Sequence, residues 1–366
     1  MNGNREVAPI HEETQSSLGE LTRGPARVKD AFAGAKGAKD ASPRAGAQLL
    51  MATKVFASEV RWRSWWHMWT TMAVLVCACV GTVLPMIPWI PRAIISCLAG
   101  LTMVRMFIIY HDYQHGTILR RSRLAQWILN TYGILIMSPP SSWKPSHNHH
   151  HKNNAKLFGA FIGSYPVMTT DAYAKATRRE RFVYAVTRHP LTILFGYLTV
   201  FVYGMCLKSL ISEPRQHVDC AVAVGIQVAL VVLLACFAPA ILFFTLLAPI
   251  GLAAALGAYL FYSQHNFPGV KMKPRQEWDH VYAALHSSSY TAMGPILSWF
   301  TGNIGYHHVH HLNAHIPFYR LPEAMAHIRE LQVPGSIRLN VLDVWRCLRL
   351  KLWDPEKNRM VTFRGV

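Results

Sequence analysis

Long apolar runs constrain this chain more than any other feature of its sequence. Two runs, at about 67–87 and 92–110, flank a Pro-broken turn, and three more follow at about 191–211, 219–237 and 240–262. Each contains about 20 residues, which at ~1.5 Å per helical residue is enough to cross a hydrocarbon core of ~30 Å. Only 15% of the 366 residues are charged, well below the share in a soluble domain. The sequence therefore predicts an all-α integral membrane protein.

The charged residues set the expected topology. Residues 116–190 carry 11 Lys and Arg against two acids, which places them in the cytosol by the positive-inside rule. The link at 213–217 (EPRQH), with Lys208 nearby, is also expected to be cytosolic, so we predict that the run at 191–211 is re-entrant or interfacial. Segment 124–138 is too short to span and should lie in the interface or pack on the bundle. The expected fold has about four transmembrane helices in two hairpins, with a cytosolic histidine-rich helical cap.

Composition divides the chain into three expected regions. Residues 1–45 are rich in Gly, Ala, Ser and charge and are predicted to form a disordered cytosolic tail. Residues 46–325 form the predicted membrane domain, in which the basic, Trp-rich segment 54–66 suits an interfacial helix. Residues 326–366 are predicted to form a C-terminal cytosolic helical extension.

Histidines gather in short clusters near the ends of the apolar runs. In His111-Asp-Tyr-Gln-His115 the i,i+4 spacing places both imidazoles on one face of a helix that continues the second run. An H-x-x-H-H triplet begins at His147, just after the helix-start signal Pro145-Ser146, and an identical triplet begins at His307. With a lone His265 after the last run, these motifs indicate a metal site on one membrane face. The nine candidate ligands are His111, His115, His147, His150, His151, His265, His307, His310 and His311.

Nine imidazoles exceed the needs of one metal ion. A catalytic zinc takes three protein ligands plus water, and imidazole also suits iron and copper. Two metals with four or five His each would use all nine and leave positions open for dioxygen. Carboxylates are expected to accept hydrogen bonds from the ring nitrogens that do not bind the metals, and Asp112 and Asp279 are the candidates. Trp143 could direct its indole N–H inward or lie in the interfacial belt. His149, His308 and His315 fall outside the spacing and are expected beside the site or at the surface.

The order of these motifs resembles that of the membrane fatty acid desaturase superfamily over about residues 55–325. That order is box, box, hairpin, lone His, box. The resemblance implies a dioxygen-dependent di-iron enzyme that removes two hydrogens from an acyl chain, with the nine His as iron ligands. The short H-x-x-x-H first box is most similar to the bacterial acyl-lipid (omega-type) branch, and His307 opens the third box where the front-end branch has Gln. Asn303, in NIGYHHVHHL, matches a recurrent family position that contacts an iron or a water. Phe261 stands where the acyl-CoA branch has Asn.

The residues and the resemblance converge on a fatty acid desaturase that inserts a double bond into a lipid-linked acyl chain. Its expected cofactor is two iron ions, with dioxygen as co-substrate, in a bacterial inner membrane with the site on the cytosolic face. No H-P-G-G haem motif occurs, so a ferredoxin or b-type cytochrome is the expected electron donor. Membrane lipids, and no nucleic acid, are the other expected partners. The donor is expected to contact Arg120, Arg121, Arg123, Arg178, Arg179 and Arg181.

Three alternatives remain open at this point. A di-iron hydroxylase or ketolase acting on a lipid or carotenoid would share the ligand set and retain oxygen in its product. A membrane zinc hydrolase would use a subset of the His. A metal transporter is disfavoured, because no His or carboxylate lies at mid-membrane depth to form a path.

Overall fold

The computed structural model describes residues 44, 46–157 and 163–365. Apart from Arg44, the expected N-terminal tail lies outside these residues. Residues 45–366 belong to one compact unit, which contains every element described below. The helical prediction is confirmed for this unit, because it is mostly helical.

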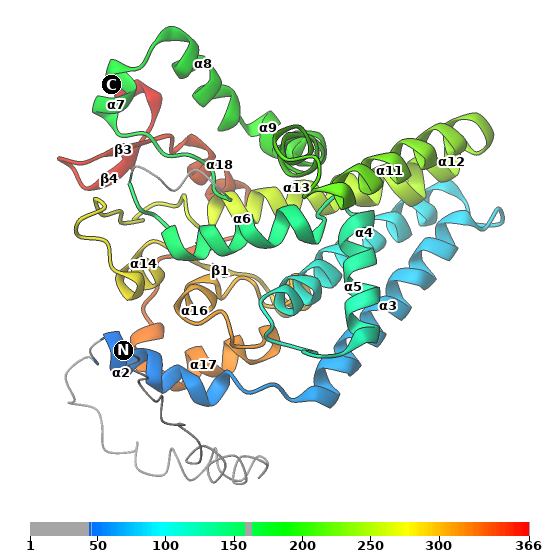
Figure 1. Cartoon of the computed structure of the whole chain (residues 1–366), viewed down its shortest axis with the longest axis horizontal. Coiled ribbons are helices and arrows are strands. Elements are labelled where there is room, and N and C mark those ends of the chain that lie inside the picture. Colours follow the sequence, from blue (N-terminus) through cyan, green and yellow to red (C-terminus); the bar gives the residue numbers. More distant parts are fainter. Residues whose placement is uncertain (1–43, 45, 158–162, 366) are drawn as a thin grey trace, which may run out of the picture. The chain divides into compact units, whose positions relative to one another are not determined.

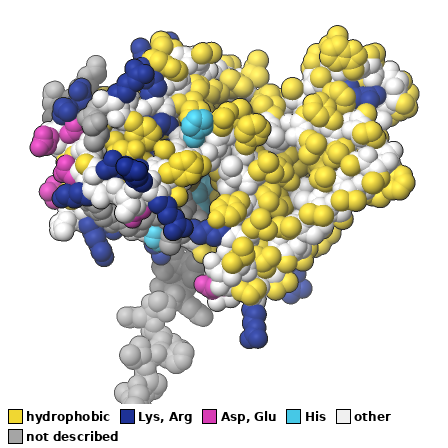
Figure 2. All heavy atoms as spheres, turned by 90° about the horizontal axis from the view of Figure 1, so that it is seen from above, with side chains coloured by type: hydrophobic (Ala, Val, Ile, Leu, Met, Phe, Trp, Pro, Cys, Tyr) yellow, Lys and Arg dark blue, Asp and Glu magenta, His cyan; other side chains and the backbone are white. Residues whose placement is uncertain are grey.

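Four helices among the described residues are long and apolar enough to cross a membrane, as the sequence predicted. The first hairpin pairs α3 (Arg61–Val83) with α4 (Trp89–Gln114). The second pairs α11 (Val218–Phe237) with a continuous helix, Pro239–Ser263, that comprises α12, η4 and α13. Apolar side chains cover the part of the surface that these spans form, whereas Lys and Arg gather at the other end (Figure 2).

The first span begins earlier than predicted. Its helix starts at Arg61, so half of the Trp-rich segment expected as a separate interfacial helix forms the first turns of α3. No Gly or Pro interrupts residues 61–80, and the helix therefore continues without a break. Before it lie α2 (Gly46–Thr53) and the 3-10 turn η2 (Lys54–Phe56).

Two apolar segments do not count among the four spans. The run near 191–211 forms α9 (Pro190–Leu194), η3 (Tyr197–Leu207) and α10 (Lys208–Ser212). In Figure 1 the coil beside the α9 label is seen nearly end on while α11 and α13 lie across the picture, so this segment crosses the spans. Helix α5 (Arg123–Leu135) packs against α4 and α11. Packing on the helix bundle was one of the two positions predicted for segment 124–138.

Short helices make up the cap and carry two of the three histidine boxes. Most of these helices contain fewer than 11 residues. The elements are α6 (Pro140–Asn153), α7 (Thr170–Lys175), α8 (Arg178–Thr187), α14 (His280–His286), α15 (Pro295–Phe300), α16 (His307–Leu312), η5 (Phe318–Arg320), α17 (Leu321–His327), η6 (Arg329–Leu331), α18 (Val341–Arg349) and η7 (Phe363–Gly365).

Two small sheets depart from the all-α prediction. Within the described residues, β1 (Tyr290–Ala292) pairs in parallel with β2 (Ser336–Arg338), and β3 (Leu352–Asp354) pairs antiparallel with β4 (Arg359–Val361). Strands of three residues are too short to show a period-2 pattern, which is why the sequence did not reveal them. The first sheet ties the C-terminal region to the loop that precedes the third box.

Residues beyond 325 share a core with the segment that follows His265. Phe267, Val270 and Met272 pack there against Ile337 and other apolar side chains from the C-terminal region. The buried C-terminal members of this cluster are Ile337, Cys347, Trp353 and Met360. The predicted helical extension therefore contains one complete α-helix and three short strands, and it packs beside the histidine-bearing chain.

Candidate metal centre

The first histidine box lies where the second span continues out of the apolar run. Helix α4 extends to Gln114, and His115 is its C-cap residue. Gly116 follows with φ of 68°, a left-handed conformation that ends the helix at little cost for glycine. His111 and His115 therefore lie one turn apart on one helix face, as predicted.

The second box lies on α6, which begins five residues earlier than predicted. Its first residue is Pro140, and Pro145 is inside the helix. Proline is well suited to the first helical position, so the Pro139-Pro140 pair was the true start signal. All of the triplet from His147 to His151 remains on the helix.

The start of α6 is capped by a residue that the sequence did not single out. Pro139 is the N-cap residue and has no side-chain acceptor. Instead Asp219, at the start of α11, accepts a hydrogen bond of 3.0 Å from the backbone N–H of Ser141 and another from its hydroxyl. His217 Nδ1 lies 2.9 Å from the same hydroxyl. His217, Asp219 and Cys220 are close enough to suggest a further metal site, but Ser141 already engages two of them, which identifies a cap.

The third box forms the short helix α16, whose six residues are all buried. The turn before it passes close to β1. A Cβ atom added at Gly305 would lie 2.5 Å from the carbonyl oxygen of Thr291, so only glycine fits this approach. Asn303 has φ of 55° and donates its side-chain amide to the carbonyl oxygen of Phe318, 3.2 Å away. These features fix the position at which α16 enters the cap.

Five histidines form one convergent set, which we call the five-His set. One ring nitrogen of each lies within 4.8 Å of those of all the others. The Nε2 atoms of four members form a row of close neighbours. They are separated by 2.9 Å between His111 and His147, 3.1 Å between His147 and His151, and 3.0 Å between His151 and His310. The members are His111, His115, His147, His151 and His310.

The remaining four histidines form a second convergent set, which we call the four-His set. Its ring nitrogens also lie within 4.8 Å of one another. Nε2 atoms are separated by 3.2 Å between His150 and His311, 3.1 Å between His311 and His307, and 2.9 Å between His307 and His265. The lone His265 therefore joins the boxes.

The two triplets are divided between the two sets. His147 and His151, one turn apart on α6, belong to the five-His set, whereas His150 points to the four-His set. On α16 the division is reversed, because the pair one turn apart belongs to the four-His set and His310 to the five-His set. Each H-x-x-H-H helix thus contributes to both sets, a division that residue spacing alone could not reveal.

Outer ring nitrogens of three histidines have defined partners. His111 Nδ1 lies 3.0 Å from Asp112 Oδ1, and Asp112 Oδ2 accepts a 2.7 Å hydrogen bond from the backbone N–H of Phe318. In the four-His set, His150 Nδ1 lies 2.6 Å from the Ser164 hydroxyl and His265 Nδ1 lies 3.0 Å from the carbonyl oxygen of Ser287. Such contacts keep the proton on Nδ1 and turn the Nε2 lone pair toward the centre of each set.

The other predicted site residues take varied positions. Asp112 lies against His111 as expected, whereas Asp279 is exposed and caps α14 through the backbone N–H of Tyr282. Trp143 is buried, and its ring stacks on His147 at 4.4 Å between centroids. Asn303 and Asp112 both bind the backbone of Phe318, Asn303 at its carbonyl oxygen and Asp112 at its N–H. Of the His expected outside the ligand set, His308 is buried with Nε2 3.0 Å from the Leu331 carbonyl oxygen, His149 is half-buried and His315 is exposed.

The chemistry of both sets fits a two-metal centre. Burial lowers the pKa of His265 to about 4 and holds the pKa values of His147, His307 and His311 well below the usual value. The imidazoles are therefore neutral at pH 7, as metal ligands must be. Among the described residues no group hydrogen-bonds to the buried His115 Nε2, which leaves this nitrogen available to a metal.

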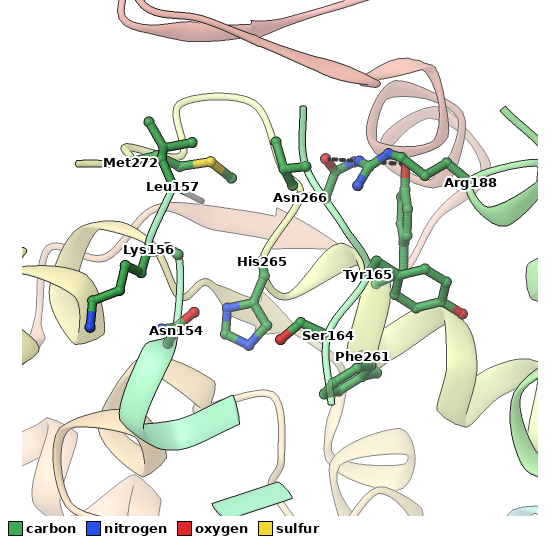
Figure 3. A pocket seen from close by; sticks show the side chains of 13 residues that line it. Asn154, Lys156, Leu157, Ser164, Tyr165, Arg188, Phe261, His265, Asn266 and Met272 are labelled. Atoms are coloured by element: carbon green, nitrogen blue, oxygen red, sulfur yellow. Dashed lines mark hydrogen bonds between the residues drawn. The ribbon is translucent and has the colours of Figure 1, made fainter. Parts of the chain in front are cut away.

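A small cavity with both polar and apolar lining residues lies beside the four-His set (Figure 3). It is lined by His265, Ser164 and Phe261, among others, and holds about 50 Å³. At ~10–15 Å³ each, a few waters would fill it. Arg188 is fully buried at its edge and donates to Asn266 Oδ1 at 2.6 Å and to Tyr262 Oη at 3.1 Å. The five-His set has no residue in this lining.

Comparison with known proteins agrees with this geometry. The family model described as "Fatty acid desaturase" matches residues 87–341. A "Fatty acid desaturase" of Bacillus subtilis (strain 168) is 29% identical over 274 residues, which covers 74% of this chain and 77% of the relative. Two cyanobacterial proteins, each named "sn-1 oleoyl-lipid 12-desaturase", also match. The protein of Picosynechococcus sp. is 25% identical over 72% of this chain and 76% of its own, and that of Anabaena variabilis is 26% identical over 71% and 76%.

The family match spans the second membrane helix, both H-x-x-H-H helices and His265. It therefore includes all nine histidines whose ring nitrogens converge. Two convergent histidine sets beside four candidate spans are the arrangement that the motif order indicated. The chain belongs to the fatty acid desaturase family of membrane oxidoreductases.

Proposed function

We propose that this desaturase acts on fatty acyl chains carried by membrane lipids and holds two iron ions in its two histidine sets. The observation that carries the proposal is the convergence of nine buried or half-buried ring nitrogens into one set of five and one of four. Both sets consist of neutral nitrogen donors, which suit iron. Two bound iron ions would supply the dioxygen chemistry that removes one hydrogen from each of two neighbouring acyl carbons.

The protein's own groups hold the ligands in place. Asp112, Ser164 and the Ser287 carbonyl fix three rings by their outer nitrogens. Asn303 is proposed to act indirectly, through the Phe318 peptide, and Trp143 by stacking on His147. Because the boxes are packed among apolar and aromatic side chains, bulk water has little access to the reacting positions.

A lipid-linked substrate is supported by two observations. Two of the relatives are named for action on an oleoyl-lipid. In addition, His111 follows directly from a membrane span and His265 follows another, so acyl chains in the bilayer can approach both sets along the protein surface. A soluble acyl carrier would need a separate entry route.

Desaturation reduces one dioxygen to two waters, and it takes two electrons and two protons from outside the acyl chain. We propose that a separate acidic carrier, a ferredoxin or b-type cytochrome, supplies the electrons at the basic surface of segment 116–190. Arg120, Arg121, Arg123, Arg178 and Arg179 are exposed there. Arg181 was expected among the contacts but is half-buried and donates to the carbonyl oxygens of Ala174 and Ala176, so we no longer include it.

We also propose that both histidine sets face the cytosol, since segment 116–190 is basic and the loop at 213–217 carries Arg215 close to Lys208. Single cysteines placed at Arg121 and Arg215, which are exposed, should react only with reagents applied from the cytosol. A cysteine at Met86, in the turn between α3 and α4, should react only from the opposite side. External labelling at Arg215 would contradict the topology.

Expression in a host without desaturases tests the function. The purified protein should contain iron at about two ions per chain, and intact lipids of the host should gain a double bond detectable by mass spectrometry. The His150→Ala variant should form no product and should contain less than the full amount of iron, whereas the His149→Ala variant should remain active. One zinc ion per chain would indicate a hydrolase, and oxygen retained in the product would indicate a hydroxylase.

A further inference from the structure

Helix α18 (Val341–Arg349) has two apolar faces, and the protein covers only one of them. On the covered face Cys347 is fully buried, and Val344 and Leu348 pack with Tyr259 and Tyr262 of α13. On the other face Val341 is 88% exposed, Leu342 53% and Trp345 52%. Trp345 lies four residues after Val341 and three after Leu342, so it adjoins both of them and the three side chains form one patch on the helix surface.

The contacts of α18 place this patch at the end of a membrane span. The Tyr262 hydroxyl, in the last turn of α13, donates to the Leu350 carbonyl oxygen at 3.0 Å. Asn266, which follows His265, donates its amide to the Cys347 carbonyl oxygen at 2.8 Å. Helix α18 therefore lies beside the end of the fourth span, where that span leaves the hydrocarbon core.

Basic side chains border the patch. Arg349 lies over the Trp345 ring at 4.2 Å, and Arg346 is exposed and pairs with Asp343 at 3.3 Å. Tryptophan and arginine on one amphipathic helix match the boundary between lipid headgroups and acyl chains, where the ring lies in the boundary and the guanidinium contacts phosphate. An acidic protein partner would leave the three apolar side chains without a matching surface.

We propose that α18 lies on the membrane surface and binds anionic phospholipid on the side that carries the histidine sets. Val341, Leu342 and Trp345 enter the boundary layer, and Arg346 and Arg349 contact the phosphates. Because the C-terminal end of α18 is bonded to Tyr262 and Asn266, the membrane surface then supports the chain on both sides of His265.

Spin labels on the exposed patch test the proposal without measuring turnover. The half-buried and exposed cysteines Cys77, Cys79, Cys97 and Cys236 are replaced by alanine, and a nitroxide is placed at Val341→Cys or Leu342→Cys. The matched control is Glu356→Cys, an exposed position in the turn between β3 and β4. The full chain is reconstituted in phosphatidylcholine vesicles that contain phosphatidylglycerol, and collisions with oxygen and with a water-soluble nickel chelate are measured.

We expect nickel collisions at positions 341 and 342 to be several-fold fewer than at position 356, with more oxygen collisions. Nickel accessibility equal to that at position 356 would overturn the proposal. Protection that arises only when an acidic electron carrier is added would also overturn it, in favour of a protein partner. Since the readout does not depend on desaturation, it is separate from any failure of the proposed function.

A charge variant tests the lipid class. The label at Leu342→Cys should lose nickel accessibility more strongly in vesicles with phosphatidylglycerol than in phosphatidylcholine alone. The double substitution Arg346→Gln and Arg349→Gln should abolish this difference, whereas the matched substitution Arg359→Gln, in β4, should preserve it. A difference that survives the double substitution would contradict binding of anionic headgroups by α18.

Discussion

The two histidine sets are alike in their nitrogen donors and differ in what surrounds them. The five-His set has an outer contact to a buried carboxylate, that of Asp112, whereas the four-His set has a hydroxyl and a carbonyl, those of Ser164 and Ser287. A small cavity lies beside His265 of the four-His set. One more ligand and an outer carboxyl group favour firm binding of a cation at the five-His set, while fewer ligands and a cavity favour exchange of a ligand at the four-His set.

The sets also differ in the elements that hold them. Four members of the five-His set come from two helices of at least 14 residues, α4 and α6, or from the residue that caps α4. Two members of the four-His set come from the six-residue helix α16, and His265 follows the end of α13. The four-His set therefore depends more on the cap being fully folded.

Loss of a ligand should have the largest effect and should distinguish the sets. His147→Ala leaves four neutral ligands in the five-His set, whereas His307→Ala leaves three in the four-His set. Both variants should lose desaturation below detection, and His307→Ala should lose nearly all iron from its set while His147→Ala retains part. Iron analysis with Mössbauer spectroscopy measures this, with His149→Ala as the control. Equal iron loss in both variants would remove the distinction between the sets, and a fully active His150→Ala protein would contradict the ligand assignment.

The outer partners give the next largest effect. Asp112→Asn removes the carboxyl group that contacts His111 Nδ1 and should lower metal affinity at the five-His set by roughly 10- to 100-fold. Ser164→Ala removes a neutral contact of 2.6 Å from His150 and should have a smaller effect, confined to the four-His set. Chelator titrations that follow iron release from each set compare the two variants. If Ser164→Ala had the larger effect, the outer carboxyl group would not be what distinguishes the sets.

Loss of the helix cap on α6 should reduce the iron content of both sets equally, because α6 contributes histidines to each. Asp219→Ala removes the acceptor for the Ser141 N–H and should destabilise the protein by ~1 kcal/mol, the usual cost of losing a helix cap. Asp219→Asn retains an acceptor and should recover most of this stability. Thermal unfolding and iron content together give the result, and loss of iron from only one set would show that α6 does not move as a unit.

The smallest expected effect is a change of folding stability with pH, which arises at Lys351 on the side of the protein that carries the four-His set. Lys351 is buried beside Arg188, and burial lowers its pKa from 10.5 to about 8. Between pH 8 and 10.5 the unfolded chain binds more protons at this residue than the folded protein does, so stability should rise with pH across this range. Lys351→Met should flatten that rise, whereas Lys357→Met, at an exposed lysine, should leave it. A Lys351→Met protein with an unchanged pH profile would contradict this account.

Much of the architecture could be predicted from sequence, because membrane spans and histidine boxes are local patterns. The length and hydropathy of the apolar runs predicted two hairpins, and i, i+3 and i+4 spacing predicted which imidazoles share a helix face. Asp112 was found because it adjoins His111. These predictions needed only residues that lie close together in the chain.

What the sequence could not predict depends on contacts between distant segments. The division of each triplet between two sets follows from how α6 and α16 pack. The cap from Asp219 to Ser141 joins residues 78 positions apart. The start of α6 was misplaced because Pro145, which lies inside the helix, was taken as the start signal in place of Pro140 at its first position.

The shared use of α6 and α16 by the two sets has a consequence for how the protein matures in the cell. Neither metal site can exist until both helices have docked, so a nascent chain has no half-built site that could capture one ion early. The first ion to arrive fixes the orientation of helices that also carry ligands for the second, and it thereby removes part of the ordering cost of the second binding event. Metal insertion should therefore be cooperative and late, with fully loaded and empty molecules outnumbering those with a single ion during biogenesis.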